Sequence, residues 1–169
     1  IFGDNSSGEL VNNITGVSLG AITGSAVAQE VEVAFSGGLD QYFVVNDARG
    51  HGSGRYTTIH SSDMTRSGGS EIIGSGNIAL KVTGGIADIV KRAGQDNSDI
   101  IVGSQLSGDY APLNAPVTLL ERERGTTPNI VGAYGVLPHL RVTVPAFPVA
   151  GFYTGELTFT LYDCSETSC

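Results

Sequence analysis

Residues 27–35 read V-A-Q-E-V-E-V-A-F, and this stretch decides the class of fold. One side carries Val27, Val31, Val33 and Phe35, and the other carries Ala28, Glu30, Glu32 and Ala34. Only Gln29 interrupts the apolar side. Because successive side chains of a β-strand point to opposite faces, this alternation predicts a strand with one buried face and one wetted face.

The same alternation recurs towards the C-terminus and, more weakly, along the rest of the chain. Its clearest repeats are residues 140–144 (L-R-V-T-V) and 156–161 (E-L-T-F-T-L). Further strands are predicted over residues 17–22, 41–45, 56–61, 77–82, 99–102 and 117–121. Residues 85–93 fit a helix, because Ile86, Ile89, Val90 and Ala93 could share one face, or equally a strand, because Ile and Val are β-branched. Short strands separated by Gly- and Ser-rich turns predict an all-β fold, an Ig-like or jelly-roll-type β-sandwich.

Composition excludes several classes of protein. The 169 residues fit one domain, which we expect to fold without a metal or a disulfide network. The net charge of −8 argues against a general nucleic-acid binder, since binding phosphates requires clustered Lys and Arg. A hydrophobic content of 40% is too high for a wholly disordered chain. No apolar run approaches the roughly 18 residues that span a membrane.

We predict three parts: an N-terminal extension over residues 1–25, a β-sandwich domain over 26–163, and a C-terminal tail over 164–169. The chain begins Ile1-Phe2-Gly3-Asp4 and has no initiator Met. We interpret it as a secreted chain whose signal peptide has been removed, or as a trimmed chain. The expected location is extracellular, at a cell surface.

Few residues suggest catalytic or metal chemistry. His51, His60 and His139 show no spacing typical of metal ligands, and a Ser-His-Asp triad is recognised by geometry rather than by composition. We therefore expect no enzyme and no cofactor. The one candidate metal site is a calcium site formed by Asp96, Asn97, Ser98 and Asp99. These oxygen-bearing side chains suit a hard cation, but they lack the spacing of an EF-hand loop, and an Asx turn that caps a strand is the simpler interpretation.

The remaining candidate sites concern covalent modification. Cys164 and Cys169 are predicted to form a disulfide that closes a small terminal loop, because an even number of cysteines in a secreted chain favours pairing. Two free thiols or a bond to a neighbouring subunit are the alternatives. Asn5 and Asn13 begin N-x-S/T triplets and are candidate glycan acceptors.

Two stretches carry a resemblance to a known family. Residues 43–54 read F-V-V-N-D-A-R-G-H-G-S-G and are followed by S-S-D-M-T at 61–65; residues 140–145 read L-R-V-T-V-P and are followed by A-G-F-Y-T-G-E-L-T-F-T-L at 150–161. In order and spacing these stretches resemble WxL-type bacterial cell-surface proteins. The resemblance implies a secreted Ig-like β-sandwich, with the core of its closing hairpin formed by Tyr153, Leu157, Phe159 and Leu161. Both signature Trp residues of that family are missing, since Arg55 and Phe159 stand at those positions.

The leading functional hypothesis is an extracellular structural subunit that forms a pilus-like filament or a surface layer with copies of itself. The assembly strand would carry Leu10, Ile14, Val17, Leu19 and Ala21, and it would add to the sheet of the next subunit. Alternatively, residues 1–25 form the first strand of their own sandwich. The second hypothesis is a monomeric surface module that binds cell-wall or host polysaccharide. Its aromatic candidates are Tyr42, Tyr56, Tyr110, Tyr134, Phe147 and Phe152.

Overall fold

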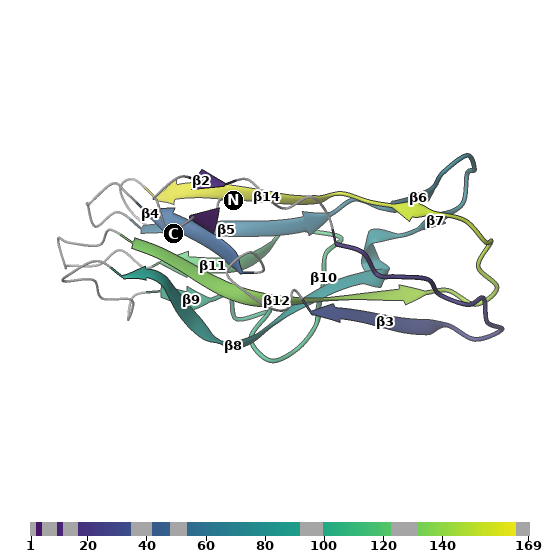
Figure 1. The fold of residues 1–169 in the computed structure, drawn as a ribbon, viewed down its shortest axis with the longest axis horizontal. Coiled ribbons are helices and arrows are strands. Elements are labelled where there is room, and N and C mark those ends of the chain that lie inside the picture. The colour runs from purple at the N-terminus through teal and green to yellow at the C-terminus, as the bar shows by residue number, and fades with distance from the viewer. Residues whose placement is uncertain are drawn as a thin grey trace.

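The computed structural model describes residues 3–4, 10–11, 17–34, 42–47, 54–91, 100–122 and 132–164, with the main chain alone at 3–4, 10–11, 47, 87–91, 132 and 163–164. These residues form antiparallel strands joined by turns, together with one 3-10 helix, η2 (Ser75–Asn77). The prediction of an all-β, sandwich-like fold is confirmed (Figure 1). None of the described segments forms a helix long and apolar enough to cross a membrane.

The first large sheet is organised by β12 (Gly132–Val144). One edge of β12 pairs with β8 (Ile78–Lys91), and β10 (Ala111–Pro112) continues the sheet beyond β8. The other edge is shared by two strands: β4 (Phe43–Asp47) pairs with the first part of β12, and β3 (Gln29–Ala34) pairs with the last part.

The second large sheet has the strand order β14 (Leu157–Cys164), β5 (Gly54–Ser61), β11 (Val117–Arg122) and β9 (Ile100–Val102). The register between β11 and β5 shifts between Thr118 and Leu120. The residue at this bulge, Leu119, is fully buried. The bulge therefore lets two successive leucines, Leu119 and Leu120, both enter the interior, which a regular strand would not allow.

Two smaller sheets lie outside this pair. β6 (Met64–Arg66), β7 (Ile72–Ile73) and β13 (Tyr153–Thr154) form a three-stranded sheet, which extends one end of the molecule, on the right in Figure 1. β1 (Gly3–Asp4) and β2 (Leu10–Val11) pair with each other, and β1 lies beside β4.

One apolar core fills the space between the large sheets, with Ile59, Leu80, Leu119, Val136 and Val142 among its members. The segment between β9 and β11 crosses from one sheet to the other. Within it, the Leu113 N–H donates to the Ile78 carbonyl, and the Leu113 carbonyl accepts from the Ser61 N–H, both at 2.8 Å. Because Ile78 and Ser61 belong to different sheets, this crossing ties the two layers together by main-chain hydrogen bonds.

An aromatic pair joins the two sheets along one side of the sandwich. The rings of Phe43 on β4 and Phe159 on β14 stack with centroids 4.8 Å apart. β4 belongs to the first sheet and β14 to the second. The pair therefore covers the core where the two sheet edges meet.

The alternation that predicted the fold holds in its main parts. In β3, Val31 and Val33 are half-buried while Glu30 and Glu32 are exposed. The placement of Val27 on the buried side is wrong, since Val27 is 68% exposed. The reason is that β3 begins only at Gln29, after Val27.

The open choice for residues 85–93 is resolved as a strand over its described part. Residues 85–91 continue β8, and their main chain pairs with β12 as far as the Lys91–Gly132 pair. Two register shifts in this ladder accommodate the bend of a long strand. Pairing with β12 and the preference of β-branched Ile and Val for strands both favour this conformation.

Candidate functional site

The N-terminal segment is the first candidate. Of the predicted assembly residues, Val17 and Leu19 are half-buried and pack against the core, while Ala21 is exposed. Leu10 lies in β2, where only the main chain is described, and Ile14 is outside the described residues. The side chains of this segment thus hold it against its own domain.

The prediction of a strand over residues 17–22 is wrong. These residues form no ladder, and Gly20 has a φ of +77°, which lies in the left-handed region and interrupts an extended strand. The Ser18 hydroxyl accepts a hydrogen bond from the Gly20 N–H at 3.3 Å. A side chain two residues away thus takes the place that a neighbouring strand would fill in a ladder. Within the described residues, one main-chain hydrogen bond links residues 17–28 to the rest of the domain, from the Phe147 N–H to the Ser25 carbonyl at 2.7 Å.

The same segment contains a short sequence motif that is independent of the strand-like alternation. Residues 16–20 read G-V-S-L-G, which matches the G-x-S-x-G pattern of a nucleophilic serine. That pattern requires a sharp turn between a strand and a helix. Residues 17–20 instead lie in irregular chain, and no helix follows them in 21–34. Ser18 is exposed and lacks the strand, sharp turn and helix that make such a serine a nucleophile.

The closing hairpin is the second candidate. Tyr153, Leu157 and Phe159 are half-buried and pack against the core. The expectation that Leu161 belongs to this core is wrong, because Leu161 is 58% exposed. Leu161 lies on β14, which is an edge strand of its sheet, and beyond the stacked Phe159, so less of the core reaches it.

An exposed apolar loop joins β12 to β13. Residues 145–152 read P-A-F-P-V-A-G-F and contain no polar side chain. Phe147 and Phe152 are 77% and 84% exposed, and Val149 is 46% exposed. We call residues 145–152 the apolar tip. Three of the nine large apolar side chains that are exposed among the described residues lie in this one loop.

The apolar tip is held in place at several points. The Tyr153 hydroxyl donates to the Val149 carbonyl, and the Ser67 N–H donates to the Phe152 carbonyl, both at 2.8 Å. Phe147 has a φ of +53°, a left-handed conformation that is uncommon for a bulky residue. Its N–H bond to Ser25 fixes this conformation. The tip is therefore a shaped feature of the domain, and its two rings are presented to the solvent.

The ion pair between Arg66 and Glu71 lies against the apolar tip. Arg66 Nε and Glu71 Oε2 are 2.6 Å apart, and the Arg66 side chain lies against Gly151. The hydrogen bond between them raises the pKa of Arg66 and lowers that of Glu71. Both groups are thus charged near neutral pH and neutralise each other, so they add no net charge beneath the tip.

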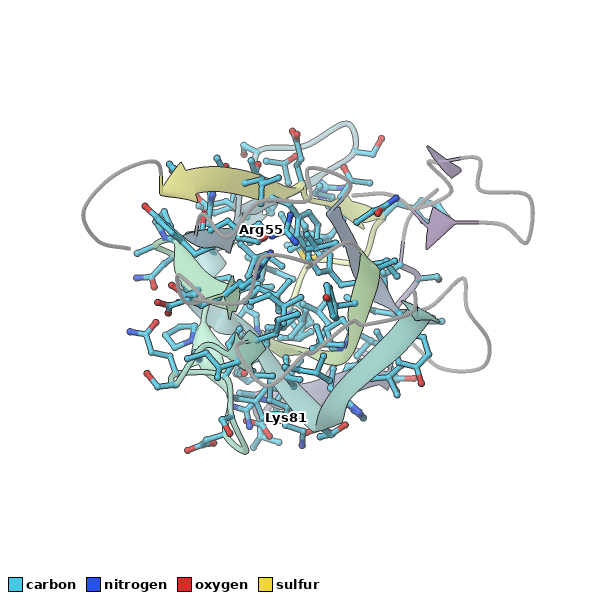
Figure 2. All side chains as sticks on the ribbon, turned by 90° about the vertical axis from the view of Figure 1, so that its left-hand side faces the viewer. Arg55 and Lys81 are labelled. Carbon is cyan, nitrogen blue, oxygen red and sulfur yellow. The ribbon has the colours of Figure 1, made fainter. Side chains whose placement is uncertain are left out.

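The interior contains an unexpected polar group. Arg55 and Arg122 are 5% and 2% exposed, and they pair across the ladder between β5 and β11. Tyr134, from the opposite sheet, is buried beside them, and all three side chains have interaction partners. Figure 2 shows Arg55 among the side chains between the sheets, whereas Lys81 lies on the outer surface. Arg55 stands at one of the two positions where the WxL resemblance has Trp.

A small cavity adjoins these arginines. Its volume is about 20 Å³, and it is lined by Val45, Arg55, Thr57, Ile100, Leu120, Glu121, Arg122 and Tyr134. A cavity must offer about 10–15 Å³ to hold one water molecule, whereas ligand pockets typically measure several hundred. This cavity therefore has room for a single water molecule.

The outer face of the first sheet carries a cluster around Tyr110. Lys81 Nζ and Arg141 Cζ lie 4.3 Å and 4.2 Å from the centre of the Tyr110 ring. Burial, with a smaller effect of Glu32, raises the pKa of the Tyr110 hydroxyl above its ordinary value. Two cations on one ring hold the loop that carries Tyr110 against the sheet.

Several predicted site residues lie outside the described residues. They are Asn5, Asn13, Asp96, Asn97, Ser98, Asp99 and Cys169, and for Cys164 the main chain alone is described. The calcium site, the glycan acceptors and the disulfide therefore stay predictions. Within the described segments, no group of three or more His, Cys, Asp or Glu side chains is arranged to hold a metal ion.

The chain matches no family model, no curated protein and no solved structure in comparisons with known proteins.

Proposed function

We propose that this chain is an extracellular structural subunit that assembles with copies of itself into a pilus-like filament or a surface layer, by adding a β-strand to the neighbouring subunit. The observation that carries the proposal is the way residues 17–28 are held. Val17 and Leu19 bury apolar surface, yet a single main-chain hydrogen bond links the described segment to its own domain. Such a segment gains main-chain bonds when it adds to the edge of another sheet.

The chain also offers an edge to receive such a strand. Within the described residues, β14 pairs on one side with β5 and has no ladder partner on the other. Edge strands are commonly protected against pairing by Lys or Pro. The eight residues of β14 contain neither, and their one charged residue is Asp163. We therefore assign β14 as the acceptor edge.

The resemblance to WxL-type proteins supports the proposed location. The matching stretches include β4, most of β6, the end of β12 and the first part of β14, and the resemblance implies display at a cell surface. Arg55 and Phe159 stand where that family has its signature Trp residues. We therefore do not expect this chain to attach to a cell wall through those positions. Arg55 is directed into the sandwich, and Phe159 is half-buried and stacked on Phe43.

Electron microscopy tests the proposal. The native chain is compared with a chain lacking residues 1–25, and the proposal expects filaments or sheets from the first and monomers of reduced stability from the second. A peptide of residues 1–25 added to the truncated chain should raise its melting temperature, because it occupies the vacant edge.

A pair of substitutions refines this test. Val17→Ser together with Leu19→Ser removes the apolar side chains and should reduce assembly, whereas Ser18→Thr, at an exposed position between them, should not. A native chain that stays a well-folded monomer under all conditions would refute the proposal. It would leave a monomeric module for cell-wall or host polysaccharide as the better account.

A further inference from the structure

We propose that Tyr56 on β5 and Tyr162 on β14 form a site of covalent modification, at which oxidation by hydrogen peroxide and a haem peroxidase joins the two rings in a dityrosine cross-link within one copy of the chain. The cross-link ties the edge strand β14 to its neighbour in the sheet. It is independent of the proposed strand addition, because it leaves the free edge of β14 unused.

The ladder between the two strands holds the tyrosines opposite each other. In the pairing of β14 with β5, Tyr162 is the Cα partner of Tyr56. Residues directly opposite each other on antiparallel strands point to the same face, with Cβ atoms about 4.5–5.5 Å apart. The main chain of both strands therefore fixes the distance between the side chains, and no movement of a loop is needed to bring them together.

The two rings already have an arrangement that favours coupling. Their centroids are 4.6 Å apart, and their planes are inclined to each other by 14°. A near-parallel stack at this separation places edge carbons of the two rings close to van der Waals contact. Because the fold holds both reacting groups together, their coupling is effectively unimolecular and is faster than coupling between separate molecules.

The pair lies on the outer face of its sheet. Tyr56 stands between Arg55 and Thr57, which are 5% and 3% exposed and face the interior of the sandwich. Since successive side chains of a strand point to opposite faces, Tyr56 and its partner point outward. Tyr162 is 42% exposed and Tyr56 is half-buried, so an oxidant in solution can reach the Tyr162 ring.

The step balances as the oxidative coupling of two phenols. Each phenol gives up one electron and one proton and becomes a phenoxyl radical. The two radicals form a carbon–carbon bond between one Cε atom of each ring, and the hydrogen on each joined carbon then moves to its ring oxygen and restores the phenol. The pair thus loses two hydrogen atoms, which one molecule of hydrogen peroxide takes up as it is reduced to two molecules of water.

The other four tyrosines of the chain are less suited to this reaction. Tyr134 is 1% exposed, and Lys81 and Arg141 lie over the Tyr110 ring. Burial raises the pKa of Tyr110, which keeps its phenol protonated and therefore harder to oxidise. Tyr42 and Tyr153 are half-buried like Tyr56, but within the described part of the chain neither stacks on another tyrosine.

The test treats the native chain with a haem peroxidase and hydrogen peroxide at low protein concentration. We expect a monomer that is lighter by two hydrogen atoms and shows dityrosine fluorescence, which no Trp emission obscures in this chain. Trypsin cleaves after Arg55, Arg66 and Arg141, so the expected product is the peptide 56–66 joined to the peptide 142–169. The rate constant for its formation should not depend on protein concentration.

Conservative substitutions locate the cross-link. Tyr56→Phe and Tyr162→Phe each keep the stacked ring but remove the phenol, and each should lower the yield of cross-linked monomer by about tenfold or more. The matched control combines Tyr42→Phe with Tyr153→Phe and should cross-link like the native chain. This control also removes the second tyrosine of the peptide 142–169, so the linked residue in that peptide is identified.

Stability gives a second readout. The cross-link closes a loop of about a hundred residues, and the lost chain entropy of the unfolded state should raise the melting temperature of the cross-linked monomer by roughly 5–10 °C. Tyr56→Phe and Tyr162→Phe, treated in the same way, should melt close to their untreated forms.

Three results would overturn the proposal. They are dityrosine found only in covalent dimers, a linked peptide that joins a tyrosine other than Tyr56 or Tyr162, and equal yields from the native chain and the two single variants. Each of these results leaves the proposed function untouched, since the comparison of native and truncated chains by electron microscopy tests strand addition separately.

Discussion

The stacked pair of Phe43 and Phe159 allows a quantitative test of how the two sheets are joined. The rings lie at 4.8 Å with an interplanar angle of 14°, and Phe43 is 3% exposed. We consider a double-mutant cycle with Phe43→Leu and Phe159→Leu, because leucine keeps most of the apolar surface but removes the ring. The coupling energy of the cycle then reports the stacking itself.

The expected magnitudes follow from burial. Phe43→Leu is a nearly volume-conserving change in the core and should cost about 1 kcal/mol. Phe159→Leu should cost less, since Phe159 is only half-buried. The stacking should contribute a coupling energy of about 0.5–1.5 kcal/mol. With a urea m-value of about 1–3 kcal/mol per M, this coupling shifts the unfolding midpoint by a few tenths of a molar unit or more.

The assay is urea unfolding followed by far-ultraviolet circular dichroism and tyrosine fluorescence, since the chain contains no Trp. Equal m-values in all four proteins are required for the energies to be compared. The double variant could lose as much free energy of unfolding as the two single variants lose when added together. The coupling energy would then be zero, and the rings would not stabilise each other. The contact between β4 and β14 would then not close the sandwich through the two rings.

Three further predictions concern stability. Leu113→Ala should cost about 3–5 kcal/mol by urea unfolding, because Leu113 is fully buried, whereas Leu161→Ala at an exposed position should cost well under half as much; equal losses would contradict the burial assigned to them. Phe147→Asn should raise the melting temperature in calorimetry, since relief of a left-handed bulky residue is worth about 1–3 kcal/mol, and a lower melting temperature would argue against strain at Phe147. The hydrogen bond from the Ser75 N–H, at 2.7 Å, lowers the pKa of Asp63 below its ordinary value of 3.8. In acid the unfolded chain therefore binds more protons at Asp63, so its stabilising effect is complete above pH 3.8 and is lost as the pH falls through the lowered pKa. The unfolding midpoints of the native chain and of Asp63→Asn should converge in acid, and a constant difference down to the lowest pH would contradict this.

The sequence predicts the sheets well where one face is buried and the other is wetted. Residues 140, 142 and 144 are all buried, as their alternation with Arg141 and Thr143 indicates. The pattern fails where a short run alternates without a neighbouring strand. Val17 and Leu19 alternate with Ser18 as a strand would, but Gly20 adopts a positive φ and no ladder forms.

The candidate surfaces were only partly predictable. A run of eight residues without a polar side chain at 145–152 is visible in the sequence, but an apolar run is as compatible with a buried strand as with an exposed loop. The burial of Arg122 could not be foreseen, since E-R-E-R at 121–124 is typical of a solvated surface. The ladder with β5 and β9 directs the side chain of Arg122 inward, together with Arg55 and Ile100.

The central position of β12 determines when this fold can be completed. Its thirteen residues pair with β3, β4 and β8, which lie between residues 29 and 91. A ribosome delivers those three strands first, and each then has an open edge until residues 132–144 have been made. Folding must wait for these long-range pairings, which makes it slow compared with that of a domain built from local hairpins. While it waits, the chain exposes alternating apolar strands to aggregation, so its yield should depend on a chaperone that binds extended segments.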